Sequence, residues 1–449
     1  MTDKIQTTLR DSAAMRWTAL LLLSLAMFCA YIFVDILSPI KELMQEQRGW
    51  DSTAFGTMQG SETFLNVFVF FLIFAGIILD KMGVRFTAIL SGAVMLTGAL
   101  IKYYAISDSF AGSGLEVWFT NNLNHIPVFE QLGVSPFYEG MPASAKVAAC
   151  GFMIFGCGTE MAGITVSRGI VKWFKGREMA LAMGSEMALA RLCVATCMIF
   201  SPFFAKLGGN IDVSRSVAFG VVLICIALMM FVVYFFMDKK LDSQTGEAEE
   251  KDDPFKISDL GKILTSMGFW LVALLCVLYY SAIFPFQKYA VNMLQCNLTF
   301  HELPANSYWA SSSVTIVQYA IMLVVAATAF MFNFMKNKAM KNIMLLVSVF
   351  CLVLYCYMGY MRQSAESIFA VFPLLAVGIT PILGSYVDHK GKAASMLVLG
   401  SLLLIVCHLT FAFILPQFKS SQVGGVIVAY VTILVLGASF SLVPASLWP

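Results

Sequence analysis

Charge is scarce in this sequence. Only 12% of its 449 residues are Asp, Glu, Lys or Arg, whereas 59% are hydrophobic. A soluble domain of this length could not keep so much apolar surface away from water, so the composition predicts a protein whose solvent is the lipid bilayer. The net charge of +2 gives no reason to expect nucleic acid as a partner.

The side chains that usually build enzyme and metal sites are also few or scattered. There are four histidines, and no His/Cys/Asp cluster or nucleophile elbow appears. Ten of the eleven cysteines sit inside apolar runs, which is typical of membrane packing rather than of a disulfide or zinc framework. We therefore predict no enzymatic activity, no cofactor and no bound metal. No cleavable signal peptide is evident, because the first apolar run is too long.

The apolar residues fall into about twelve runs of membrane-spanning length. The predicted helices cover residues 16–40, 54–79, 86–105, 146–173, 179–205, 216–237, 268–291, 309–334, 343–360, 367–387, 393–415 and 422–448. A long polar loop, 106–145, has room for a short surface helix and is predicted to cover the extracytoplasmic side. A charged linker, 239–267, separates two halves.

One short charged turn occurs twice, as GIILDKMGVR at 76–85 and GSYVDHKGK at 384–392. The glycines of this turn predict a close approach between helices, and its aspartates predict helix caps or ion pairs. Its basic residues predict that the turn lies in the cytoplasm. Two copies in register predict an internally duplicated membrane protein. The residues assigned a gating or conformational role in these turns are Gly76, Asp80, Lys81, Gly83 and Arg85 in the first copy, and Gly384, Asp388, Gly391 and Lys392 in the second.

Glu160 and Arg191 are the strongest candidates for a substrate site. Each lies near the midpoint of its predicted helix, and the two helices are consecutive and antiparallel. A charge at this depth must be compensated, either by its counterpart or by a zwitterionic ligand between the two. A fixed ion pair that only specifies helix packing stays open as the alternative.

Four further residues complete the candidate set. Tyr31 and Asp35 lie near the outer end of the first run, where an acid is either functional or merely interfacial. Tyr280 belongs to an aromatic cluster in the seventh run that is suited to lining a cavity. Pro285 interrupts the hydrogen bonding of the same run, as a gate hinge or as a passive kink.

The charged turns resemble the loop motif of the major facilitator superfamily, which lies between helices 2 and 3 and again between helices 8 and 9. YIFVDILSP, FGCGTE, VKWFKGRE, MALARL, FPF and SLVPASLWP narrow the resemblance to the major facilitator superfamily domain-containing protein 1 group of lysosomal dipeptide uniporters and to its bacterial relatives. The resemblance implies a dipeptide in a central cavity, with its amino group at Glu160 and its carboxylate at Arg191.

This resemblance predicts an all-α fold of two pseudo-symmetric helical bundles. The bundles would cover residues 1–238 and 268–449, with the linker 239–267 between them. Because the second charged turn follows the tenth run instead of the eighth, we predict a helical hairpin inserted at about 309–360. By the same count, the last two helices are predicted to be missing.

We therefore predict a multi-pass transporter of small zwitterionic solutes, most of all dipeptides or short peptides, working by alternating access. Two alternatives stay open: a carrier of another organic anion or sugar-like solute, with or without proton coupling, and a membrane receptor or scaffold that transports nothing. Lys and Arg number 18 in the predicted cytoplasmic segments against 9 outside, which places the N-terminus in the cytoplasm. No acidic dileucine sorting signal appears, which favours a bacterial inner membrane. The sequence identifies no accessory subunit.

Overall fold

The computed structural model describes residues 8–175, 177–245, 261, 263–301, 303–304, 306–332, 335, 337–390, 393–418 and 422–447, and these contain helices and no strand. The chain forms two compact units. Unit 1 comprises residues 1–34, 42–186 and 212–284, and unit 2 comprises residues 35–41, 187–211 and 285–449. All the boundaries except the one between residues 211 and 212 fall inside helices, so the units differ from the predicted bundles. The limits of those bundles stay predictions.

We call the long polar loop at 106–145 the polar cap. The first part of the chain, up to the end of this cap, contains η1 (Leu9–Asp11), α1 (Ala13–Asp35), η2 (Ser38–Ile40), α2 (Lys41–Arg48), α3 (Ser52–Gly60), η3 (Ser61–Thr63), α4 (Phe64–Phe68), α5 (Phe71–Ile106), α6 (Gly114–Asn121) and α7 (Pro127–Gln131). The central part contains α8 (Ala143–Phe174), α9 (Met179–Ala205), α10 (Val213–Thr245) and α12 (Met267–Asn297). The last part contains η4 (Tyr308–Ala310), α13 (Ser312–Phe332), α14 (Lys338–Met361), α15 (Ala365–Phe369), α16 (Val371–Lys390), α17 (Ala393–Leu409), the π-helical η5 (Thr410–Ile414), η6 (Leu415–Phe418) and α18 (Gln422–Leu447).

Ten helices in the described residues are long and apolar enough to cross a membrane. They account for the twelve predicted runs because α5 contains parts of two of them, and because the run at 367–387 appears as a shorter apolar helix, Ala365–Thr380. The protein is thus a multi-pass integral membrane protein. The predicted hairpin insertion and the predicted loss of two helices stay predictions.

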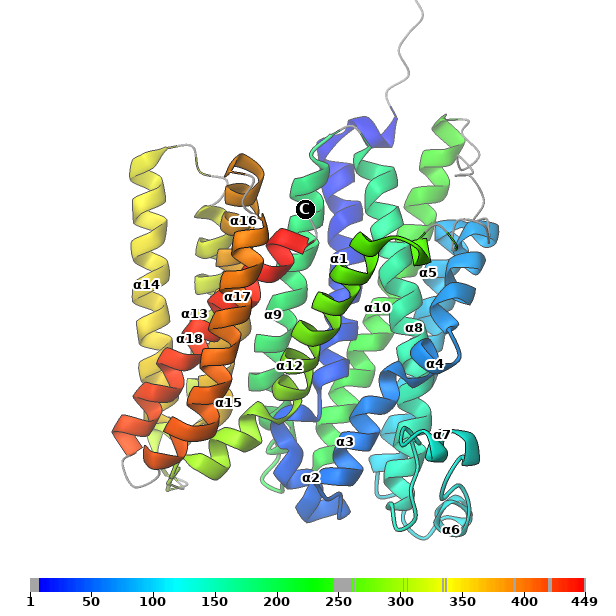
Figure 1. The fold of residues 1–449 in the computed structure, drawn as a ribbon, viewed down its shortest axis with the longest axis vertical. Helices are drawn as coiled ribbons and strands as arrows, with labels where there is room; N and C mark the ends of the chain where they lie inside the picture. Colours follow the sequence, from blue (N-terminus) through cyan, green and yellow to red (C-terminus); the bar gives the residue numbers. More distant parts are fainter. Residues whose placement is uncertain are drawn as a thin grey trace, which may run out of the picture. The chain divides into compact units, whose positions relative to one another are not determined.

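Gly83 divides α5 into two helices. It has φ 78° and ψ 167°, a conformation that costs glycine little because it has no Cβ. Figure 1 shows α3 and α6, which precede and follow α5, at the same end of unit 1, so the chain reverses direction near this turn. The first charged turn therefore does join two helices, as its sequence predicts.

The second predicted helix, 54–79, is not continuous. In the structure it consists of α3, the 3₁₀ turn η3, the five residues of α4 and the first part of α5. Phe70, between α4 and α5, has a left-handed backbone with φ 56°. A non-glycine residue seldom adopts this conformation, so the interruption is a specific feature of the fold.

The polar cap is fastened to α8. Lys146 is almost completely buried, and its Nζ donates hydrogen bonds to the carbonyl oxygens of Phe119 at 2.9 Å and Asn122 at 3.3 Å and to Asn124 Oδ1 at 2.7 Å. These acceptors lie at and just after the C-terminus of α6, where a cation compensates the unpaired carbonyls of the helix. The cap thus contains the short surface helix that the sequence had room for.

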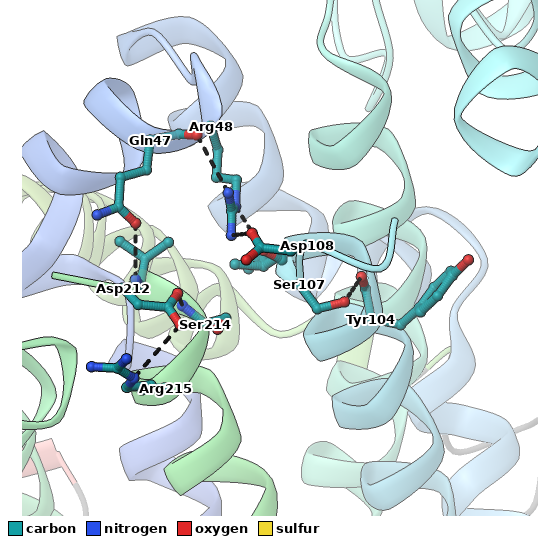
Figure 2. A network of polar contacts seen from close by, with 10 residues as sticks. Gln47, Arg48, Tyr104, Ser107, Asp108, Asp212, Ser214 and Arg215 are labelled. Atoms are coloured by element: carbon teal, nitrogen blue, oxygen red, sulfur yellow. Dashed lines mark hydrogen bonds and ion pairs between the residues drawn. The ribbon is translucent and has the colours of Figure 1, made fainter. Parts of the chain in front are cut away.

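A polar network joins three segments of unit 1 at the end that carries the cap (Figure 2). Arg48, at the end of α2, donates to the carbonyl oxygen of Ile106 at 2.7 Å and pairs with Asp108 at 2.7 Å. Gln47 Oε1 accepts a hydrogen bond from the backbone N–H of Val213 at 3.1 Å. These bonds hold α2 to the end of α5 and to the start of α10.

In unit 2, a buried polar cluster connects α13, α14 and α15. Arg362, just after α14, donates to Gln318 and, at 2.7 Å, to the hydroxyl of Thr315. The hydroxyl of Ser367 donates to the same Gln318 oxygen at 3.3 Å. The segment predicted as an inserted hairpin is therefore packed into unit 2 by hydrogen bonds as well as by apolar side chains.

Candidate functional site

The charged turn at 76–85 belongs to a cluster of ion pairs in unit 1. Asp80 accepts a hydrogen bond from Arg168 of α8 in a close ion pair. Arg85 pairs with Asp242 of α10 at 3.0 Å, and Lys81 is exposed. Two of the turn's charges thus pair with residues about 90 and 160 positions further along the chain, which matches the pairing role predicted for Asp80.

Asp238 lies at the centre of this cluster and is completely buried. It accepts hydrogen bonds from Lys172 Nζ at 2.7 Å, from Trp173 Nε1 at 2.9 Å and from the hydroxyl of Tyr234 at 3.3 Å. A buried carboxylate is stable only when it is paired in this way. Asp238 could not be singled out from the sequence, because it directly follows an apolar run and resembles the start of the polar linker.

The structure describes the first copy of the charged turn more fully than the second. A Cβ built on Gly76 would have no neighbour within 4 Å in the described part of the chain, so the close helix approach predicted there is not seen. In the second copy, Gly384 and Asp388 belong to the backbone of α16, but their side-chain positions lie outside the described residues. Gly391 and Lys392 lie outside the described residues altogether.

A second ion pair network also lies in unit 1, where the N-terminal segment meets the turn between α8 and α9. Asp11 pairs with Arg177 at 2.7 Å, and Arg16 pairs with Glu178 at 3.5 Å. The pKa of Asp11 is lowered, chiefly because the backbone N–H of Thr8 donates a hydrogen bond to its carboxylate. These contacts join η1 and the first turn of α1 to the segment between α8 and α9.

Asp35, at the end of α1, is paired inside unit 2. Its carboxylate accepts a hydrogen bond from Gln287 Nε2 at 2.7 Å and pairs with Lys288 Nζ at 2.7 Å, and only 3% of Asp35 is exposed. Gln287 and Lys288 follow Pro285 on α12, which remains helical through the proline. Compact unit 1 ends directly before Pro285, so the proline lies at a boundary between units.

Glu160 is exposed although it lies near the middle of α8. Thr159 and Met161 beside it are buried, whereas Ser167 and Val171, seven and eleven residues further on, are exposed like Glu160. These spacings place the exposed residues on one helix face. A carboxylate facing lipid at this depth would cost about 3 kcal/mol, so the face of α8 that carries Glu160 is expected to adjoin water or a ligand.

The remaining candidates occupy separate positions. Arg191 lies on the part of α9 that belongs to unit 2, with its guanidinium carbon 4.2 Å from the centre of the Phe440 ring, a cation–π contact. Tyr31 lies half-buried on α1 in unit 1. Tyr280, also in unit 1, stacks on Phe284 with ring centres 5.2 Å apart. Glu160 and Arg191 therefore belong to different compact units.

Two glycines of α8, one on each side of Glu160, differ in how closely other segments approach them. A Cβ on Gly156 would lie 2.8 Å from the carbonyl carbon of Glu62 and 3.1 Å from its Cγ. Gly156 thus lets the turn η3 contact α8 one helical turn before Glu160. Gly163, on the other side of Glu160, has no neighbour within 4 Å of such a Cβ among the described residues.

Sequence reasoning alone missed Gln287, Lys288 and Asp238 as partners of buried charge. Lys288 lies near the end of an apolar run, where a lysine commonly extends to the membrane surface, yet its ammonium binds Asp35. A polar pair directly after a proline in an apolar helix, as in FPFQK, was the available signal.

Several curated proteins are similar in sequence to this chain. The lysosomal dipeptide transporter MFSD1 of Bos taurus is 22% identical over 307 residues, which cover 67% of this chain and 50% of that protein. MFSD1 of Gallus gallus is 24% identical over 216 residues, which cover 45% of each. This chain spans about half the length of these curated relatives.

Among solved structures, the xylose transporter XylE from E. coli, in a partially occluded inward open conformation, superposes with a TM-score of 0.52 at 12% identity. The superposition covers 96% of this chain and 85% of that one, and it supports the fold alone. Residues 23–449 match the Major Facilitator Superfamily. The predicted family and the all-α membrane fold are confirmed, and this chain belongs to the Major Facilitator Superfamily of transporters.

Proposed function

We propose that this protein moves small zwitterionic solutes, most of all dipeptides, across a membrane by alternating access. Glu160 carries the proposal, because it is an exposed carboxylate near the middle of an otherwise buried stretch of α8. Such a group suits the ammonium of a zwitterion. The similarity to lysosomal dipeptide transporters supports the same substrate class.

In this proposal Glu160 binds the substrate's amino group, and Arg191 binds its carboxylate. Arg191 is suited to this role because its guanidinium can bind a carboxylate through two parallel hydrogen bonds. The face of Phe440 stabilises the cation when no substrate is present. Tyr31 and Tyr280 shape the site. The protein lies in a bacterial inner membrane, with its N-terminus in the cytoplasm.

The ion pair of Asp35 with Lys288 has a different role in this proposal. It closes the outer end of the pathway, because opening there would have to separate two groups that bind each other at 2.7 Å. Pro285 lies three residues before Lys288, where its missing N–H leaves the helix easier to bend. We assign Pro285 as the hinge, and the residues of the charged turns as the contacts that close the inner end.

Counterflow tests the substrate class. Liposomes carrying the native protein are loaded with unlabelled alanylalanine, and entry of labelled alanylalanine is followed with alanine, xylose or alanylalanine as competitor. We expect entry above that into protein-free liposomes, with competition by alanylalanine and none by xylose. Dipeptide entry at the protein-free rate, in a preparation that exchanges labelled xylose, would assign the protein to the sugar-like alternative.

A further inference from the structure

The interrupted second helix lies parallel to α8, which fixes the depth of its polar residues. Trp50 Nε1 donates to Ser144 Oγ at 2.8 Å, Ser61 Oγ donates to the carbonyl oxygen of Ala149 at 3.2 Å, and Asp80 pairs with Arg168. Residue numbers rise together along both segments in these contacts. The two segments therefore run in the same direction through unit 1, as Figure 1 also shows.

Glu62 meets α8 at Gly156, one turn before Glu160. Residues four apart on a helix have their Cβ atoms about 6 Å apart on the same face. A helical side chain also leans toward the N-terminus of its helix, so the carboxylate of Glu160 covers the turn that contains Gly156. The two carboxylates are thereby brought to the same part of unit 1.

Asn66 supplies an independent indication of a ligand. It lies on α4, four residues after Glu62, and Glu160 lies four residues after Gly156 on α8. Because the two segments run in the same direction and Glu62 meets α8 at Gly156, Asn66 lies at about the depth of Glu160. Its side-chain oxygen and nitrogen are both buried, and neither has a hydrogen-bond partner among the described residues. A buried amide without partners is costly and is expected to have one when the protein works.

We infer that Glu62, Asn66 and Glu160 form a subsite for a primary ammonium group. An ammonium has three N–H donors and no acceptor, and this set offers two carboxylates and one amide oxygen. The ammonium satisfies the oxygen of Asn66, and the amide nitrogen of Asn66 is left to donate to one of the two carboxylates. The two carboxylates supply the negative charge that a cation needs in a membrane interior. The inference rests on the proposed function, and it adds the second helix to the recognition of the substrate's amino end.

Binding by the purified full-length protein in nanodiscs tests this subsite. The ligands are alanylalanine, N-acetyl-alanylalanine and n-butylamine, and the proteins are native, Glu62→Gln, Asn66→Leu and the control Glu46→Gln, whose side chain is exposed on α2. We expect each subsite substitution to weaken alanylalanine about 10- to 100-fold, the usual cost of losing a hydrogen bond to a charged group. N-Acetyl-alanylalanine should bind weakly and equally to all four proteins.

The outcomes separate the subsite from the proposed function. Alanylalanine binding that is unchanged in Glu62→Gln and in Asn66→Leu would overturn the subsite and leave dipeptide transport intact. Binding of n-butylamine that Glu62→Gln weakens, with no binding of alanylalanine by the native protein, would support the subsite and contradict the dipeptide. Binding of neither ligand by the native protein would overturn both. Glu62→Asp, which keeps the charge, should retain binding better than Glu62→Gln if the inference holds.

Discussion

Replacing Asp238 by alanine is expected to lower the free energy of unfolding by about 3–5 kcal/mol. The carboxylate is fully buried and accepts hydrogen bonds from Lys172, Trp173 and Tyr234. Without it, Trp173 and Tyr234 lose a buried acceptor, and Lys172 keeps only its ion pair with Asp242 at 2.8 Å. Denaturation in mixed micelles, followed by tryptophan fluorescence, measures the loss. Asp238→Asn should cost less, because an amide oxygen still accepts from Trp173.

Asp108→Ala is the matched control for this loss. Its carboxylate also pairs with an arginine at 2.7 Å, but 85% of the Asp108 side chain is exposed. An exposed pair contributes little, so the expected change is below about 1 kcal/mol. Equal losses in the two variants would contradict the view that Asp238 organises the cluster.

Gly156→Ala should destabilise the protein by about 1–3 kcal/mol, the usual cost of adding a methyl group to a packed core. The added Cβ would lie 2.8 Å from the carbonyl carbon of Glu62, so backbone rather than a flexible side chain must move. Because Glu62 would shift, alanylalanine binding should weaken as well. Equilibrium unfolding and ligand binding in one preparation measure both effects.

Gly163→Ala, on the same helix, is expected to change the stability of the protein in the opposite direction. No described atom lies within 4 Å of its added Cβ, so only the higher helix propensity of alanine should count. That change is expected to stabilise α8 by up to about 1 kcal/mol. If Gly156→Ala were as stable as Gly163→Ala, the close contact between η3 and α8 would be wrong.

Much of the helical architecture is predictable because a membrane span needs a long apolar run. The fifth helix was predicted at 179–205, and α9 covers Met179–Ala205. The interruption at Phe70 could not be predicted in the same way, since VFVFFLIF contains no glycine or proline that would indicate a break.

In the candidate site, the charged residues could be predicted from the sequence, but their partners could not. Depth along an apolar run was enough to select Glu160 and Asp35, because charge within a span is expensive wherever it occurs. Their neighbours depend on contacts distant in sequence: Lys288 follows Asp35 by 253 residues. A glycine motif likewise does not specify which helix comes near: no described atom lies within 4 Å of a Cβ built on Gly76.

The central claim is that Glu160 and Arg191 bind the two ends of a transported zwitterion. Initial rates of alanylalanine counterflow in liposomes carrying the native protein, Glu160→Gln, Arg191→Ala and the exposed control Glu139→Gln test it most directly. We predict native rates for the control and at least about a 10-fold loss in each of the other two, with partial recovery in Arg191→Lys. Native rates in Glu160→Gln and Arg191→Ala, at equal amounts of folded protein, would contradict the claim.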